Sequence, residues 1–162
     1  MLEEYKSYLE EAKTNRKRYK KKAQTFKKLK DKDLDNLMHE AHDEAFNCID
    51  CLQCANCCKT TGPLFTQKDI ERIAKHLRIK PGEFIENYLK RDEDDDYVLQ
   101  STPCTFLGAD NYCSIYEVRP KACAEYPHTD MRNQKRILHL TLKNAEMCPA
   151  VALSLKRLIE TV

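Results

Sequence analysis

Apolar residues recur every three or four positions near the start of the chain, between residues 2 and 30. This spacing predicts one long helix over that range with an apolar stripe on one side. The stripe consists of Leu2, Tyr5, Leu9, Ala12, Tyr19, Ala23 and Phe26, with Arg16 occupying one position of it. A seam rich in Ala and Tyr and interrupted by Arg is weak for a coiled coil. We therefore favour a helix docked on its own domain over a coiled-coil hairpin or a dimer seam.

Four shorter helical patterns follow. A second helix is predicted from Asp33 to about Ala45, a third after Thr66, which can cap it together with Asp69, and a fourth from Pro81. The last begins at Cys148-Pro149. Only Tyr97–Leu99 and Arg136–Leu142 are plausible strands.

These patterns predict a mainly α fold. It is a small cysteine-rich, metal-stabilised domain with few short strands, preceded by a long N-terminal helix or helical hairpin. We place the helical extension at residues 1–45 and the cysteine-cluster domain at residues 46–162.

The composition leaves a thin apolar core for 162 residues. Hydrophobic residues make up 41% of the chain and charged residues 33%, and the mean hydropathy is -0.71. A metal site that contributes folding energy would therefore matter for stability. No apolar run approaches the roughly 20 residues of a transmembrane helix. The polar start Met1-Leu-Glu-Glu-Tyr-Lys6 argues against a secretory signal and predicts a cytoplasmic protein.

Positive charge is concentrated in one part of the chain. Every charged residue from Arg16 to Lys30 is basic, whereas basic and acidic residues are equal in number outside residues 1–44. Such a run is typical either of a solvated helix face or of a surface for nucleic acid or anionic membranes. We favour the solvated face, because the only aromatic residues in the run, Tyr19 and Phe26, already belong to the apolar stripe.

Nine cysteines form the main chemical signal, and five of them fall between residues 48 and 58. In a reducing cytosol such cysteines indicate metal ligands rather than disulfides. Cys51, Cys54 and Cys57 follow one another at i, i+3 steps, so they can hold three corners of an iron–sulfur cluster with a distant fourth ligand. Cys48 extends the series and could replace one of them. The adjacent Cys57 and Cys58 are expected to point apart and to serve different roles.

The remaining cysteines are Cys104, Cys113, Cys123 and Cys148. One zinc ion or one cubane cluster needs four ligands, and eight candidates remain when Cys48 is set aside. Either two sites form, or one forms and the other thiols are structural or redox groups. The tripled i, i+3 run favours an iron–sulfur cluster of the 4Fe–4S type over zinc, which more often uses two separated Cys-x-x-Cys pairs.

The cysteine pattern resembles that of the YkgJ-type cysteine-cluster family, also described as a zinc- or iron-chelating domain. The matching motifs are Cys51-x-x-Cys54-x-x-Cys57-Cys58, Cys104-x-Phe106-Leu107, Cys113-x-Ile115-Tyr116-x-x-Arg119-Pro120-x-x-Cys123 and Cys148-Pro149. They cover about residues 45 to 155. The resemblance implies that these eight cysteines bind metal and that Cys48 is a spare.

The same resemblance extends to a segment that accompanies flagellin lysine methylases, where it is associated with an iron–sulfur cluster. This implies a link to protein modification without supplying an activity. The chain departs from the family at Ala55-Asn56, where a Gly is usual, and in having Cys48.

The sequence shows no catalytic constellation. It lacks a Gly-rich nucleotide loop, a Ser/His/Asp set and the radical-SAM spacing of cysteines. We therefore favour a non-enzymatic metal-binding module with a redox, metal-handling or modification role and an unidentified protein partner. The alternative is a zinc-stabilised interaction domain that binds a protein or nucleic acid through the basic N-terminal helix.

Several polar residues near the cysteines have predicted roles. We interpret His39 and His42 as surface residues or as partners of a metal ligand rather than as ligands. His128 and Asp130 could orient a ligand or donate to sulfur. For Arg119, which precedes Pro120, we favour a buried helix start with a salt bridge.

Overall fold

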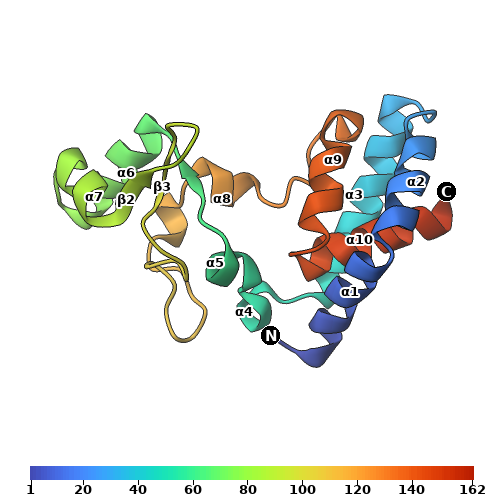
Figure 1. Ribbon diagram of the computed structural model, residues 1–162, viewed down its shortest axis with the longest axis horizontal. Helices are drawn as coiled ribbons and strands as arrows, with labels where there is room; N and C mark the ends of the chain where they lie inside the picture. The colour runs from blue at the N-terminus through green and yellow to red at the C-terminus, as the bar shows by residue number, and fades with distance from the viewer. The chain divides into compact units, whose positions relative to one another are not determined.

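The computed structural model describes residues 1–162 and is mainly helical with one small sheet (Figure 1). This confirms the predicted fold class. The chain divides into two compact units: unit 1 comprises residues 1–54 and 127–162, and unit 2 comprises residues 55–126. The division into a helical extension at 1–45 and a metal-binding domain at 46–162 stays a prediction. None of the helices has the length and apolar character needed to cross a bilayer.

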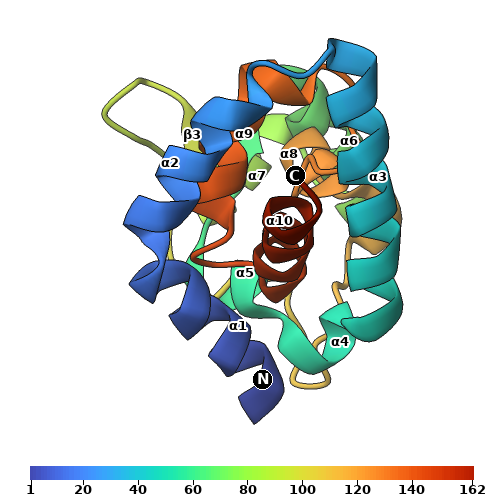
Figure 2. The same ribbon diagram turned by 90° about the vertical axis from the view of Figure 1, so that its right-hand side faces the viewer.

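Unit 1 is a bundle of helices built around its last member. Its helices are α1 (Glu3–Thr14), α2 (Arg16–Phe26), α3 (Asp31–Cys48), the short α4 (Cys51–Cys54), α9 (Gln134–Asn144) and α10 (Pro149–Thr161). All residues of α10 from Pro149 to Leu155 are buried. A helix that is apolar on every side belongs inside a bundle. Figure 2 shows α10 surrounded by α1, α2, α9 and α3.

The N-terminal stripe packs inside unit 1. Its buried residues are Tyr5, Leu9, Ala12, Tyr19, Ala23 and Phe26. This confirms the interpretation as a helix docked on its own domain. The prediction of one continuous helix is wrong, because Asn15 separates α1 from α2 with φ -90° and ψ 10°. Its side-chain amide donates to the Glu11 carbonyl at 3.0 Å, the same oxygen that accepts from its backbone N–H at 2.9 Å.

The segment Arg136–Leu142 is helical, so the strand predicted there is wrong. It lies within α9, whose buried residues Gln134, Leu138 and Thr141 follow a helical period. The Asp35 carboxylate of α3 accepts from the backbone N–H groups of Asn133 and Gln134, both at 2.9 Å. Short alternating runs do not distinguish a strand from a helix. Here a carboxylate distant in sequence caps the helix start.

The other predicted elements are present with small changes. The helix expected over 33–45 begins at Asp31 and continues to Cys48. Thr66 and Asp69 form a complete capping box before α6. Pro81 and Pro149 each occupy the first turn of a helix, as expected.

Unit 2 packs short helices against a three-stranded antiparallel sheet. Its elements are α5 (Asn56–Thr60), β1 (Leu64–Phe65), α6 (Gln67–Leu77), α7 (Pro81–Tyr88), β2 (Leu89–Arg91), β3 (Tyr97–Leu99), η1 (Tyr116–Val118) and α8 (Lys121–Glu125). The strand order is β1-β3-β2, which confirms the strand predicted at Tyr97–Leu99. In the register, Leu64 lies opposite Val98. The core around Phe84 and Ile70 also holds one side of Cys104 and Cys113.

The residue that follows Cys54 has an unusual backbone conformation. Ala55 lies between the two short helices of the cysteine run with φ 47° and ψ 19°, in the left-handed region. A side chain with a Cβ atom is disfavoured there by roughly 1–2 kcal/mol, whereas Gly is not.

We expect Ala55→Gly to leave the thermal midpoint unchanged or to raise it. Relief of the left-handed strain offsets the loss of a buried methyl group, which is about 0.8 kcal/mol. The matched control is Ala45→Gly, since Ala45 is also buried but lies inside α3. This control should lower the free energy of unfolding by about 2 kcal/mol, because Gly has a poor helix propensity and the buried methyl group is lost. If the two variants lowered the thermal midpoint equally, this account would be contradicted.

Candidate metal centre

The two units share the nine cysteines between them. Unit 1 holds Cys48, Cys51, Cys54 and Cys148, and unit 2 holds Cys57, Cys58, Cys104, Cys113 and Cys123. No disulfide bond links any of them. No three Cys, His, Asp or Glu side chains lie close enough together in this structure to bind one metal ion. The thiols nevertheless form two neighbourhoods, one in each unit.

Helix α5 presents two thiols in unit 2. The Sγ atoms of Cys57 and Cys58 lie 3.9 Å apart. The expectation that these side chains point apart is therefore wrong, because successive residues of a helical turn are about 100° apart rather than on opposite faces as in a strand. The Cys57 thiol lowers the pKa of Cys58 to about 7 by hydrogen bonding. The joint action of Cys51, Cys54 and Cys57 involves both units and stays a prediction.

A tight loop brings Cys104 and Cys113 to the same region. The backbone N–H of Cys104 donates to the Cys58 carbonyl at 2.8 Å. Leu107 forms an isolated bridge with Cys113, and Gly108 donates to the Tyr112 carbonyl at 2.8 Å. These bonds close the loop, so residues nine apart in sequence lie at its base.

Backbone N–H groups point at these two sulfur atoms. Burial raises the pKa of Cys104, and the N–H groups of Phe106 and Leu107 oppose that rise by donating to its thiol. Burial likewise raises the pKa of Cys113, opposed by the Ile115 N–H. Hydrogen bonds of this kind favour the thiolate over the thiol and are a common feature of metal–thiolate sites.

Cys123 completes the neighbourhood in unit 2. Burial, followed by the nearby thiols of Cys58, Cys104 and Cys113, raises its pKa to about 12. Each of those three sulfur atoms is therefore close enough to act electrostatically on Cys123. Four thiols from α5, the closed loop and α8 thus act on one another electrostatically in unit 2, although their side chains do not converge on one point.

A buried carboxylate fixes the helix that carries Cys123. Asp69 is 1% exposed, and its carboxylate accepts from the Lys121 N–H at the start of α8 at 3.1 Å. It also accepts from the Thr66 N–H and hydroxyl, at 2.9 and 2.7 Å. Burial alone would raise the pKa of Asp69, but the bonds from Thr66, Arg72 and Lys121 hold it below its usual value. The same carboxylate thus caps α6 and anchors α8.

Arg72 extends this anchor towards the segment before α8. Its guanidinium contacts Asp69 at 2.6 Å and donates to the Arg119 carbonyl at 2.8 Å. The sequence analysis identified Thr66 and Asp69 only as a helix cap. The second partner lies 52 positions away, and no local pattern signals it.

Arg119 has a different role from the one expected. Helix α8 does begin directly after Pro120, but Arg119 forms no salt bridge, so that part of the expectation is wrong. Its guanidinium lies 4.0 Å from the centre of the Tyr116 ring and donates to the Tyr116 carbonyl at 2.8 Å. Its positive charge lowers the pKa of Cys113 and Cys123, against the larger effect of burial. It therefore favours the thiolate forms.

The neighbourhood in unit 1 is centred on the start of α10. Burial raises the pKa of Cys148 to about 12, while the N–H groups of Val151 and Ala150 donate to its thiol. Cys51 and Cys54 add a smaller upward shift of the Cys148 pKa, so both thiols act on Cys148 electrostatically. A helix N-terminus with N–H groups aimed at sulfur stabilises a thiolate. Cys48 is exposed at the end of α3, and its role as a spare stays a prediction.

The histidines hold a loop rather than a thiol. His39 bonds the Met131 carbonyl at 3.0 Å, and His42 bonds the buried Thr129 hydroxyl at 2.7 Å. His128 lies in unit 1 with Nδ1 3.2 Å from the Met131 sulfur. These contacts fasten the segment before α9 to α3. Asp130 is exposed.

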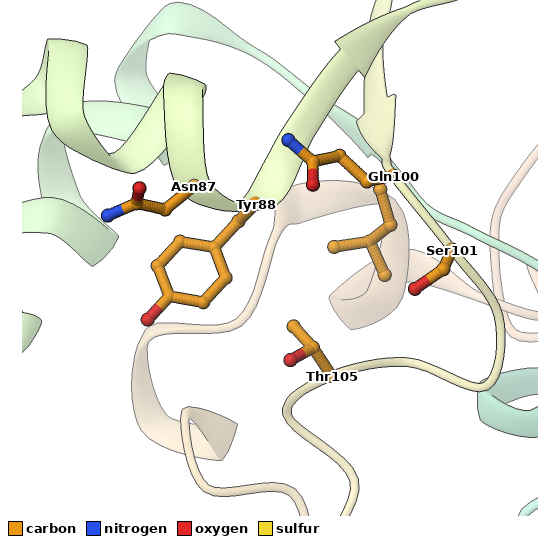
Figure 3. A pocket seen from close by; sticks show the side chains of 6 residues that line it. Asn87, Tyr88, Gln100, Ser101 and Thr105 are labelled. Carbon is orange, nitrogen blue, oxygen red and sulfur yellow. The ribbon is translucent and has the colours of Figure 1, made fainter.

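Unit 2 also has a small hollow near the loop that carries Cys104. It has a volume of about 100 Å³. Figure 3 shows Asn87 and Tyr88 on one side of it and Gln100, Ser101 and Thr105 on the other. The Gln100 side chain donates to backbone carbonyls of Glu86 and Leu89. The hollow lacks the base that would activate Ser101 or Thr105 as a nucleophile.

A family model described as "Putative zinc- or iron-chelating domain", CxxCxxCC, matches residues 50–149. The chain belongs to this family. The match confirms the resemblance seen in the sequence and supports metal chelation as the general function. Comparison with curated proteins and with solved structures found no match. The CxxCxxCC segment itself is divided between the units, since Cys51 and Cys54 lie in unit 1 and Cys57 and Cys58 in unit 2.

We expect the metal-free CxxCxxCC protein to lose stability as the pH rises above about 8.5. An unfolded thiol has a pKa near 8.5, whereas the folded values of Cys123 and Cys148 are about 12. A raised folded pKa stabilises the fold below the unfolded value, and this stabilisation is lost as the pH rises towards the folded value. Thermal midpoints should fall between about pH 8.5 and 10.

The double variant Cys123→Ser/Cys148→Ser should flatten this profile, and Cys48→Ser should not. Tyr19, whose pKa burial raises to about 12, contributes only above its unfolded pKa of about 10. The same slope in the parent and the double variant would refute the assignment to these two thiols.

Asp69→Ala should destabilise unit 2 by about 3 kcal/mol, because it leaves two helix starts and Arg72 without their shared partner. Hydrogen exchange of the α6 and α8 amides measures this loss directly. Asp94→Ala, in the exposed acidic turn before β3, is the control and should leave the protection of these amides unchanged. Unaltered protection of α8 in the Asp69 variant would show that the carboxylate is not its anchor.

Proposed function

We propose that this protein carries metal in two separate thiolate centres, one in each unit, and that iron–sulfur clusters of the 4Fe–4S type fill them. The centre in unit 2 uses Cys58, Cys104, Cys113 and Cys123, with Cys57 beside it. The centre in unit 1 would use Cys51, Cys54 and Cys148 as three ligands of its cluster, with a non-cysteine group as the fourth. The division of the eight family cysteines into two neighbourhoods carries this proposal.

The electrostatics of unit 2 support a resident cation. Burial, followed by three nearby thiols, raises the pKa of Cys123, so this thiol resists ionisation when no cation is present. A bound metal ion reverses this preference, because it neutralises the thiolates and displaces their protons. Arg119 and the N–H groups around Cys104 favour the same charged state. Without metal, the apolar surroundings favour protonated thiols. With metal bound, the positive charge of Arg119 and the N–H groups around Cys104 would stabilise the thiolates.

The chemistry of unit 1 supports iron–sulfur in particular. Cys51 and Cys54 have the i, i+3 spacing of a cluster-binding run, and Cys148 precedes a proline as the last ligand does in bacterial-type ferredoxins. Two backbone N–H groups donate hydrogen bonds to the Cys148 thiol, and hydrogen bonds to sulfur tune the reduction potential of an iron–sulfur cluster. These features suit a redox, metal-handling or modification-accessory role in the cytoplasm, where the thiols stay reduced.

Zinc is the second candidate, and one observation favours it. Unit 2 holds four thiols from three separate segments that act on one another electrostatically, and four cysteines are the donor set of a closed structural Cys₄ zinc site. Such a site would stabilise unit 2 without redox chemistry.

Metal analysis of anaerobically purified protein separates these candidates. We expect a brown protein with broad thiolate-to-iron absorption and about eight iron atoms per chain, about four for each cluster. A colourless protein holding only zinc would contradict iron–sulfur binding.

Matched variants test the division into two centres. Cys104→Ser/Cys113→Ser should lose the metal of unit 2, and Cys51→Ser/Cys148→Ser that of unit 1, each leaving about half of the total. Cys48→Ser, the control, should keep the full content. If either double variant loses all metal while it remains folded by circular dichroism, a single shared centre replaces the proposal.

A further inference from the structure

A groove with a volume of about 230 Å³ lies between α2 and α9 in unit 1. The two helices contact each other, and Figure 2 shows them side by side. The floor of the groove is aliphatic, formed by Ala23, Leu138 and Leu142. Its rim carries the cationic side chains Lys20, Lys27, Lys135 and Arg136.

The positive charge of this rim is largely uncompensated. Neither α2 nor α9 contains an acidic residue. Asp31 pairs with Lys135 at 2.8 Å, but Lys20, Lys27 and Arg136 form no ion pair. A concave surface lined by charges of one sign attracts ligands of the opposite sign.

We propose that this groove binds an acidic amphipathic helix of a partner protein. One large apolar side chain lies on the aliphatic floor, and carboxylates on the same helix pair with Lys20, Lys27 and Arg136. The groove is large enough for one Leu or Phe side chain. Helix-in-groove recognition uses anchors of this kind at helical spacing.

The groove fits nucleic acid less well. Single-stranded nucleic acids bind basic surfaces that also offer aromatic rings for stacking. Tyr19 and Phe26, the aromatic residues of α2, are 4% and 0% exposed and belong to the core. The floor offers aliphatic groups instead, which suit a protein side chain.

An anionic membrane is also a poorer fit. A helix that lies in the membrane interface inserts an exposed apolar face. The apolar face of α2 is already packed inside unit 1, and its exposed face is cationic and polar. Only screened surface attraction would remain for a bilayer.

The test measures binding of the full-length protein to a fluorescein-labelled peptide by anisotropy. The peptide has about 15 residues, with Leu and Phe at helical spacing among Glu and Asp. Lys20→Glu/Lys27→Glu should weaken binding about tenfold or more. The control Lys21→Glu/Lys28→Glu changes the net charge equally, but these exposed lysines do not line the groove, so we expect less than about threefold.

Two further measurements test the floor of the groove. Replacing Leu and Phe of the peptide by Ala, or Leu142 of the protein by Ala, should each weaken binding several-fold. Thermal denaturation checks that every variant is folded. Equal weakening by the two charge-reversal pairs would reduce the effect to diffuse attraction and overturn the proposal. Absence of peptide binding, or tighter binding of a single-stranded oligonucleotide or of phosphatidylserine vesicles, would also overturn it.

Discussion

Several thiols gathered in one place cannot all ionise, and the arrangement of unit 2 depends on this constraint. Cys123 is half-buried, and desolvation, followed by the charges of three nearby thiols, raises its pKa above that of an isolated cysteine. Protonated thiols are weak polar groups that an apolar core tolerates, whereas thiolates need a cation. The same residues therefore suit both a metal-free fold and a metal-bound one. The difference between the two states is carried by protons, which makes metal affinity sensitive to pH.

The thiols can be neighbours only because polar contacts fix the segments that carry them. In unit 2 one carboxylate, Asp69, joins α6 to α8, and Cys104 is bonded through its backbone to Cys58. In unit 1 the corresponding support is Asp35, which caps α9 and so fixes the chain that leads to Cys148. Both carboxylates act on backbone N–H groups far away in sequence. Short segments are thus held by charge-assisted hydrogen bonds where the apolar core is small.

The sequence contained the elements and the ligand candidates, but not their grouping. Helices with their own signals, such as the Thr66 capping box and the apolar α10, were predicted because propensity and burial agree locally. The strand expected at Arg136–Leu142 failed because the cap that starts α9 comes from Asp35, 98 or 99 positions away. The regular cysteine spacing likewise gave no sign that the run passes from one unit to the other after Cys54. Spacing reports local geometry, whereas a division into units depends on long-range packing.

The order of the two units along the chain has a consequence for synthesis. Unit 2 is one continuous segment, while unit 1 is interrupted by it and includes the buried helix α10 at its end. Segments emerge from the ribosome in sequence order, and domains generally fold as they appear. The thiols of unit 2 are therefore together before Cys148 has been made. If each unit binds its own metal as proposed, loading during translation begins at the inserted unit, and the helix bundle closes last.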